Sequence, residues 1–187
     1  MHGSNYRQIK SMSYSRKDFV PGAPNPKVAR FTTGKYSTEY DYTVKLISEG
    51  RLQIRHNALE AARVAASKKL TPLGEEGFYL VVKVYPFVIL RENKMIATAG
   101  ADRLQEGMRK AFGKPIGRAA AVSIGSSVLE ISVMAANLQL AKDAMKAAST
   151  KLPMRTKVEV VELGAQHASE GVPQPPVQET PLTPTAA

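Results

Sequence analysis

The run FYLVVKVY at residues 78–85 constrains the fold of this chain more than any other stretch. Apart from Lys83 it is nearly apolar on both of the faces that alternate along a strand, which is typical of a strand with neighbours on all sides. We therefore expect it at the centre of a sheet. Pro86 has no amide hydrogen to donate, so it should bend or bulge the chain before another strand, FVILRE at residues 87–92.

Two Ala-rich segments have the periodicity of helices that pack on a sheet. In the first, residues 57–70, Asn57 and Glu60 have the spacing of a capping pair. The second, residues 138–152, should be capped by Asn137 and stopped by Pro153. Each has one apolar stripe at helical spacing. The stripes consist of Leu59, Ala62, Ala66 and Leu70, and of Leu138, Ala141, Met145, Ala148 and Leu152.

Four more segments have the composition of strands, at residues 42–47, 119–125, 128–134 and 155–162. The second and third meet at Gly125-Ser126-Ser127, which predicts an antiparallel hairpin between them. The expected order is β-α-β-β-loop-β-β-α-β. Because strands do not alternate regularly with helices, the sequence predicts an α+β fold, with a mixed or antiparallel sheet and two helices on one side of it.

The charge of the chain favours a polyanionic partner. The net charge is +10 with a pI of about 9.8, and the last 24 residues hold two Glu and no Lys or Arg, so the remaining body carries +12. Such a balance favours nucleic acid or an anionic membrane surface. The sequence contains no apolar run long enough to cross a bilayer and no signal-peptide core at its N-terminus. We expect a soluble, intracellular protein.

Motifs that carry chemistry are missing from the sequence. The absence of cysteine excludes disulfides, thiol catalysis and cysteine-ligated zinc. The three histidines, His2, His56 and His167, are far apart in the chain, and there is neither a phosphate-binding glycine loop nor a His-Glu-x-x-His motif. We therefore expect no enzyme activity, no cofactor, no bound metal and no small-molecule substrate.

Composition divides the chain into three parts. Residues 1–37 are basic and Pro-rich and interleave Tyr6, Tyr14, Phe19 and Phe31 with their cations, which favours an extended arm on RNA over a flexible solubilising arm. Residues 38–163 form the α+β domain. Residues 164–187 are Pro-rich and should be a disordered tail, either an inert extension or one that presents PQPP to a partner.

A long connection, residues 100–118, lies between two expected strands without any strand alternation of its own. It carries five cations against two carboxylates, and four glycines that allow close approach to a partner. We expect it to meet a polyanion. The alternative is a surface loop with one helical turn at residues 102–110 that packs Leu104 and Met108 inward.

Cations before and along the exposed side of the first helix are candidate phosphate contacts, although a solvated basic face would have the same pattern. His56, beside the expected cap, should be structural or contact phosphate rather than act in catalysis. The predicted RNA-binding residues are Arg7, Arg16, Lys17, Lys27, Arg51, Arg55, His56, Arg63, Lys68, Lys69, Lys94, Arg155 and Lys157.

Several strings together resemble one known family: RLQIRHNALEAARVAASKKL, GFYLVVKVYPFVILRENKM, AGADRLQEGMRKAFGKPIGRAA and QLAKDAMKAASTKLPMRTKVEV. They are similar to the universal large-subunit ribosomal protein called L-sixteen in bacteria and L-ten-e in archaea and eukaryotes, here of the archaeal type. The resemblance covers residues 6–163. The opening MHGSN, in place of the usual Arg-Pro-Ala-Arg, and the Pro-rich tail depart from the family.

The resemblance implies a hammerhead-type α+β protein of the cytoplasmic ribosome. Its partners would be large-subunit rRNA near the aminoacyl-tRNA site, tRNA and neighbouring ribosomal proteins, with no membrane contact and no homo-oligomer. The long loop would point toward the peptidyl-transferase region, through Arg103, Arg109, Lys110, Gly113, Lys114 and Arg118. Two alternatives remain open: a dissociable RNA-binding or ribosome-assembly factor and, less favoured, a nucleic-acid-modifying enzyme with an unrecognised site.

Overall fold

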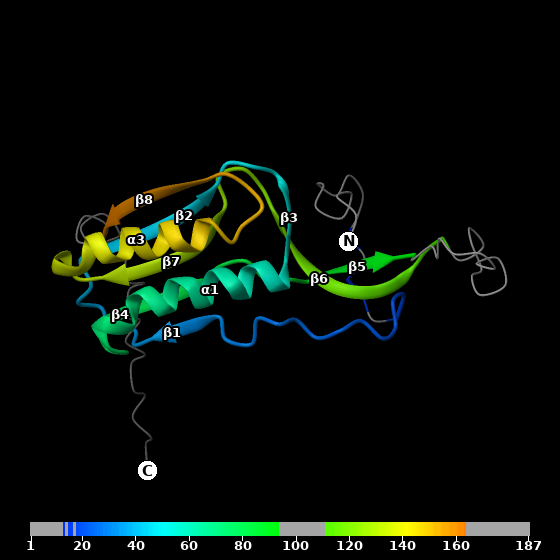
Figure 1. Cartoon of the computed structure of the whole chain (residues 1–187), viewed down its shortest axis with the longest axis horizontal. Coiled ribbons are helices and arrows are strands. Elements are labelled where there is room, and N and C mark those ends of the chain that lie inside the picture. Colours follow the sequence, from blue (N-terminus) through cyan, green and yellow to red (C-terminus); the bar gives the residue numbers. More distant parts are fainter. Residues whose placement is uncertain (1–12, 14, 17, 94–110, 164–187) are drawn as a thin grey trace, which may run out of the picture.

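The computed structural model describes residues 13, 15–16, 18–93 and 111–163 (Figure 1). Two helices, α1 (His56–Leu70) and α3 (Leu138–Ser149), pack on antiparallel sheets, which confirms the α+β prediction. The predictions for residues 1–12, 14, 17, 94–110 and 164–187 concern parts of the chain outside the described residues. The strands are β1 (Thr32–Gly34), β2 (Tyr42–Ser48), β3 (Leu52–Arg55), β4 (Phe78–Val82), β5 (Val88–Glu92), β6 (Lys114–Val122), β7 (Ser127–Val133) and β8 (Thr156–Glu162).

The larger sheet has five strands in the order β1-β4-β7-β2-β8, and every neighbouring pair is antiparallel. β4 is paired on both sides, as the apolar run predicted. Its residues Phe78, Leu80 and Val82 are buried, while Tyr79 and Val81 on the other face are half-buried. Only one face of the strand is therefore fully covered.

The smaller sheet has the order β3-β6-β5. The bend predicted at Pro86 is confirmed, and it carries the chain from one sheet into the other. Lys83–Phe87 lie between β4 of the larger sheet and β5 of the smaller, and the Phe87 amide donates to the Tyr85 carbonyl (3.0 Å). β5 and β6 form a ribbon that extends away from the two helices (Figure 1).

The predicted hairpin at Gly125-Ser126-Ser127 is wrong, because β6 belongs to the smaller sheet and β7 to the larger. The turn between them bonds to the end of β2 instead. The Gly125 amide donates to the Ser48 carbonyl (2.8 Å), and the Ser48 amide donates to the Ser126 carbonyl (3.0 Å). β6 also begins at Lys114, inside the expected loop, because it pairs with β5 from Glu92 onward. β1 and β3 were not predicted.

The apolar stripe of α1 is placed as predicted, since Leu59, Ala62, Ala66 and Leu70 are fully buried. In α3 the stripe residues Ala141, Met145 and Ala148 are buried, but Leu138 is half-buried. The helix ends at Ser149, so the predicted end at Pro153 is wrong and Leu152 is buried from the chain after the helix. α1 and α3 lie side by side over the larger sheet (Figure 1). The predicted cap of the first helix is wrong: α1 begins at His56, no side chain caps it, and the Glu60 carboxylate binds Arg63. Asn137 does hold the N-cap position of α3, but its side chain makes no capping hydrogen bond.

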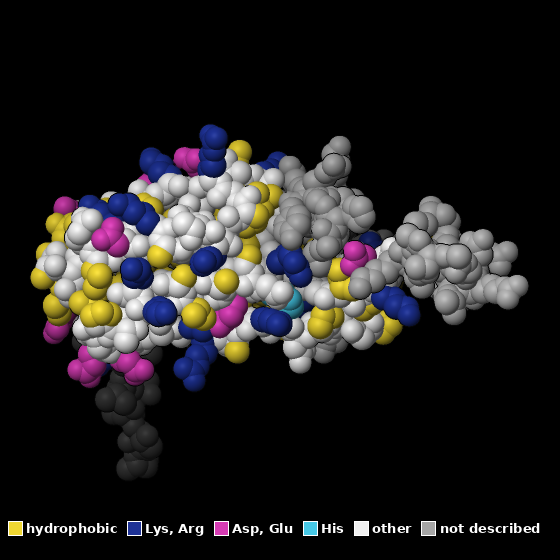
Figure 2. Space-filling model, viewed as in Figure 1, with side chains coloured by type: hydrophobic (Ala, Val, Ile, Leu, Met, Phe, Trp, Pro, Cys, Tyr) yellow, Lys and Arg dark blue, Asp and Glu magenta, His cyan; other side chains and the backbone are white. Residues whose placement is uncertain are grey.

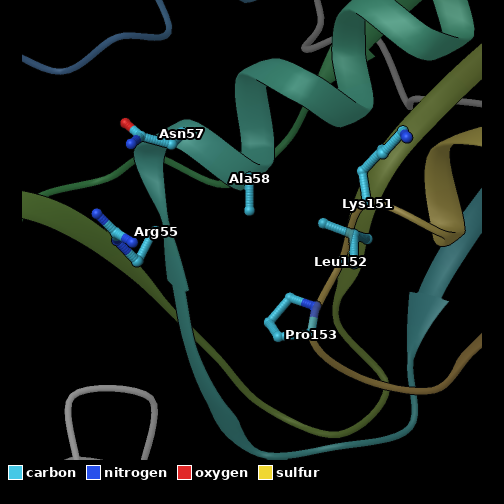
Figure 3. Close-up of a pocket in the computed structure, with 6 residues that line it drawn as sticks. All are labelled: Arg55, Asn57, Ala58, Lys151, Leu152 and Pro153. Atoms are coloured by element: carbon cyan, nitrogen blue, oxygen red, sulfur yellow. The ribbon is translucent and has the colours of Figure 1, made fainter. Parts of the chain in front are cut away.

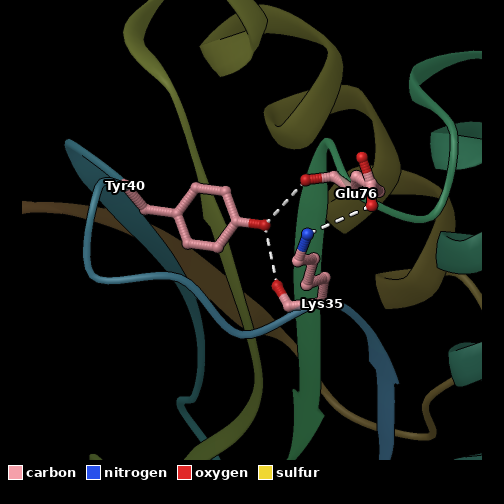
Figure 4. Close-up of polar contacts among 3 residues, drawn as sticks. All are labelled: Lys35, Tyr40 and Glu76. Carbon is pink, nitrogen blue, oxygen red and sulfur yellow. Dashed lines mark hydrogen bonds and ion pairs between the residues drawn. The ribbon is translucent and has the colours of Figure 1, made fainter.

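A buried tyrosine fixes the edge of the larger sheet beside β1 (Figure 4). The Tyr40 hydroxyl lies 2.8 Å from the Lys35 carbonyl oxygen and 3.1 Å from that of Glu76, and burial raises its pKa. The side chains of Lys35 and Glu76 form an exposed ion pair at 3.1 Å. Gly34 has a φ of +91°, and a Cβ there would lie 2.1 Å from the Phe78 carbonyl oxygen, so only glycine lets β1 approach β4.

Candidate nucleic-acid interface

The two helices and the segments beside them form the most basic part of the described surface. Residues 55–73 and 138–155, here called the helix layer, hold eight Lys and Arg against Glu60 and Asp143, a net of +6. Figure 2 shows Lys and Arg side chains spread along this face, while most Asp and Glu side chains gather toward one end. The helix layer therefore presents a positive surface with enough cations to contact several phosphates.

The opposite face of the larger sheet also has lysines, but carboxylates neutralise them. Lys45 stands directly across from Glu130 on β7 and Glu159 on β8. Glu130 also pairs with Lys83 at 3.2 Å, and Glu159 with Lys157 at 2.9 Å. The excess positive charge of the sheet domain is thus concentrated on the helix side.

A hollow of about 610 Å³ opens where the start of α1 meets the chain after α3 (Figure 3). Arg55 and Lys151 stand on opposite sides of it, and Ala58 and Leu152 lie between them. No carboxylate lines the hollow, and neither cation has an ion-pair partner in the part of the chain that the structure describes. Two cations without ion-pair partners at opposite edges of one hollow, with their charged ends directed outward, are suited to contact phosphates beside it (Figure 3).

A cationic cluster lies behind this hollow, around His56. The imidazole is 5% exposed, and its Nδ1 accepts a hydrogen bond from the Lys27 amide at 3.2 Å. Burial, then the charges of Arg55, Lys27 and Arg118, lower the pKa of His56. A neutral, buried and already bonded histidine favours the structural role over phosphate contact.

The same cluster anchors part of the predicted arm. Arg118 on β6 donates through Nε to the Pro24 carbonyl at 2.9 Å, and Val20 and Val28 are buried. The described residues of the arm lead from this anchor along the body into β1 (Figure 1). Cations of the arm are thereby held beside those of the smaller sheet.

Arg63, which the sequence predicted as an RNA contact, is bound by other side chains of the protein instead. Its guanidinium makes two hydrogen bonds to Glu60, at 3.0 and 2.6 Å, and a third to Thr33 Oγ1 at 3.3 Å. The hydrogen bond to Glu60 raises the pKa of Arg63. Arg63 therefore ties α1 to β1, and its charge is largely neutralised.

The other predicted residues fall into three groups. Arg16, Lys27, Arg51, Lys68, Lys69, Lys114, Arg155 and Lys157 are exposed. Arg55, Arg118 and Gly113 are half-buried. Arg7, Lys17, Lys94, Arg103, Arg109 and Lys110 lie outside the described residues.

Three lysines that sequence reasoning missed complete the helix layer: Lys142, Lys146 and Lys151, on or just after α3. Lys146 and Lys151 are exposed, and Lys142 is half-buried. Lys142 and Lys146 fall between the apolar positions of the stripe, so the same reading that singled out α1 would have found them.

The end of the β5–β6 ribbon is held by a compact set of contacts. The Arg91 guanidinium lies 3.6 Å from the centroid of the Phe112 ring, and it also donates to the Phe112 carbonyl at 2.8 Å. Gly113 has a φ of +77°, and a Cβ there would lie 2.8 Å from the Glu92 carbonyl carbon. Only glycine fits this turn into β6.

Over the described residues, no group of His, Cys, Asp and Glu could hold a metal ion. Nor does any described helix have the length and apolar character to cross a membrane. The arrangement offers positive charge at fixed positions. Its fold and charge distribution define a basic α+β protein of the class that binds nucleic acid.

Comparison with known proteins agrees with this class. The family described as ribosomal protein L16p/L10e matches residues 9–159, and the chain belongs to that family. Proteins called large ribosomal subunit protein uL16 are similar to it over most of its length. The one from Sulfolobus acidocaldarius is 48% identical, over 90% of this chain and 97% of its own length. Those from Metallosphaera sedula and Hyperthermus butylicus are 49% and 50% identical, over 86% and 84% of this chain and 94% and 89% of their own lengths.

The family resemblance expected from the sequence is thereby confirmed, including its archaeal type. The protein is a structural constituent of the large ribosomal subunit in the cytoplasm and not an enzyme. Membership in this family implies ribosomal RNA and other ribosomal proteins as its partners.

Proposed function

We propose that the protein binds large-subunit rRNA through its helix layer, near the aminoacyl-tRNA site, and helps to position tRNA there. The observation that carries the proposal is the asymmetry of charge. Cations of the helix layer around the Arg55–Lys151 hollow lack carboxylate partners within the described residues, whereas those of the opposite sheet face are paired. Within the layer Arg63 pairs with Glu60 and Lys146 with Asp143, but its net charge remains positive. An excess of cations on one side of the molecule is suited to one RNA-facing side.

The mechanism is electrostatic and architectural. Lys and Arg neutralise phosphates that RNA tertiary folding brings close together, and counterions are released when they bind. The core beneath the helix layer keeps these cations at fixed spacing, because the apolar faces of α1 and α3 are buried against the larger sheet. Exposed cations outside the layer, Arg16, Lys27 and Arg51, extend the proposed contact. Lys157, also a predicted RNA-binding residue, belongs instead to the opposite face, where it pairs with Glu159.

The part in tRNA positioning is assigned to the β5–β6 ribbon and the segment it carries. Residues 94–110 join the end of the ribbon that lies farther from the helices. Their cations, Arg103, Arg109 and Lys110, are joined on β6 by the exposed Lys114. The Arg91–Phe112 contact and the Gly113 turn give that segment a fixed base.

Replacement of residues 95–110 by a short Gly-Ser linker tests the proposal. The segment ends before β6, so the ribbon and its contact with the arm through Arg118 are retained. Large subunits lacking the protein would be reconstituted with this variant, and incorporation would be measured separately from tRNA binding at the aminoacyl site and from peptide synthesis. We expect normal incorporation through a high-salt gradient, with impaired tRNA binding and synthesis.

Removal of residues 164–187 is the control, and it should leave incorporation, tRNA binding and peptide synthesis unchanged. Failure of the linker variant to incorporate would make the segment an anchor. Unimpaired tRNA binding would contradict the positioning role. If the unaltered protein washes off mature subunits in high salt, it is a dissociable assembly factor.

A further inference from the structure

Residues 83–87, which join the two sheets, expose an unusual row of side chains. Lys83, Tyr85 and Phe87 point outward, whereas Val84 is half-buried against the core and Pro86 is buried. Tyr85 is 52% exposed and Phe87 is 41% exposed. Two large aromatic rings thus stand at the surface beside a cation.

The backbone beneath these rings is fixed at several points. The Lys83 amide donates to the Val128 carbonyl at 3.0 Å, and the Phe87 amide donates to the Tyr85 carbonyl at 3.0 Å around the buried Pro86. A three-residue turn with proline at its centre has little freedom. The rings are therefore presented by a rigid segment and not by a mobile loop.

One face of Tyr85 is already stacked on Phe31. The two ring centroids are 5.3 Å apart and the ring planes differ by 26°. Phe31 is itself held, since its carbonyl accepts a hydrogen bond from the Val82 amide at 2.8 Å. Because Tyr85 is 52% exposed, a planar group could extend this stack on the side of the ring away from Phe31.

We propose that this site binds an unpaired nucleotide of RNA, with its base stacked on Tyr85 opposite Phe31. Phe87 borders the base, and Arg30, next to Phe31 and exposed, is available to the neighbouring phosphates. Unpaired bases are commonly bound on exposed aromatic rings flanked by cations. The inference rests on the proposed RNA binding and adds the class of nucleotide and the residues that bind it.

An RNA base fits the site better than an apolar protein segment. The exposed aromatic side chains of this segment are only two, Tyr85 and Phe87, and exposed cations adjoin them in Lys83 and, next to Phe31, Arg30. Lys83 is itself paired with Glu130 but remains half exposed. The net charge of +10 also favours the polyanion.

The test compares variants of the full chain in binding to a hairpin RNA with one bulged 2-aminopurine, whose fluorescence falls on stacking. Tyr85→Leu keeps an apolar side chain on Phe31 but removes the aromatic face, and Tyr85→Phe keeps both. Tyr36→Ala is the matched control. Tyr36 is 70% exposed, and its ring meets Tyr79 edge-on at 78°, so it begins no parallel stack.

We expect Tyr85→Leu to lose roughly five- to a hundredfold in affinity and to abolish the fluorescence quenching. Its salt dependence should be unchanged, because no charge is removed. Tyr85→Phe and Tyr36→Ala should behave as the unaltered protein. If Tyr85→Leu binds and quenches as the unaltered protein does, the inference is overturned although RNA binding stands. The inference is also overturned if the unaltered protein binds the RNA without quenching, even if Tyr85→Leu binds more weakly. Absence of RNA binding by the unaltered protein would refute the proposed function itself.

Discussion

The hollow between α1 and the end of α3 gives the sharpest quantitative prediction. Replacing both Arg55 and Lys151 by alanine removes the two cations at its opposite edges. Each phosphate contact contributes about 0.7 to 0.9 to the slope of log affinity against log salt concentration. The double variant should therefore lower the magnitude of this slope by roughly 1.4 to 1.8.

The same numbers fix how the defect depends on salt. A fourfold rise in salt, from about 50 to about 200 mM, should reduce the difference in affinity between the unaltered protein and the variant by about tenfold. Binding would be measured on large-subunit rRNA transcribed in vitro, at several salt concentrations. Thermal unfolding would be followed in parallel, and it should change little because the Lys151 side chain is exposed and Arg55 is only half-buried.

The matched control is the double variant Lys35→Ala and Lys45→Ala, which removes the same charge. Lys35 pairs with Glu76, and Lys45 stands between Glu130 and Glu159. Lys35 is already ion-paired and Lys45 has a carboxylate directly across on each neighbouring strand, so the slope should be nearly unchanged. Equal loss of slope in both double variants would mean that only net charge matters, and assignment of the RNA-facing side to the helix layer would be refuted.

Two further predictions concern residues whose charge serves the fold. Arg63→Ala removes the contacts to Glu60 and Thr33 and should lower the free energy of unfolding by about 1–2 kcal/mol in urea titrations, with an unchanged salt slope of RNA binding; a lower slope with unchanged stability would contradict this. Because the pKa of His56 is lowered from 6.5, the unfolded chain takes up this proton first as the pH falls. The free energy of unfolding is therefore unaffected by this group above pH 6.5 and falls below it. The fall is up to about 1.4 kcal/mol per pH unit, and it stops once His56 of the folded protein is protonated too. His56→Gln, which retains an acceptor for the Lys27 amide, should remove this part of the pH dependence, and an unchanged urea-unfolding profile between pH 5 and 8 would refute the role.

The sequence by itself determined the elements whose signals are local. Helical periodicity identified both buried stripes, because their apolar residues must share one face of each helix whatever that face meets. The apolar run at residues 78–85 identified a strand with neighbours on both sides, and Pro86 marked a bend after it, but the change of sheet at that bend had no signal in the sequence. The family strings and the excess of cations indicated the class of protein before any contact was known.

Strand partners were decided only by the tertiary structure. β6 and β7 adjoin in sequence and have similar apolar patterns, yet β6 pairs with β3 and β5 and β7 with β2 and β4. A pattern of alternation states that a strand has a buried face, but not which strands complete its sheet. β1 and β3 were missed for the same reason, since strands of three and four residues are defined by their partners and not by their composition.

The roles of individual cations were likewise decided in three dimensions. Arg55 and Arg63 look equivalent in the sequence, but one lines a hollow with Lys151 and the other is bound by Glu60 and Thr33. Composition determines how much positive charge a chain carries. Whether a given cation faces solvent or is neutralised by a carboxylate depends on residues that the fold brings together from distant positions, and that pairing has no local signature.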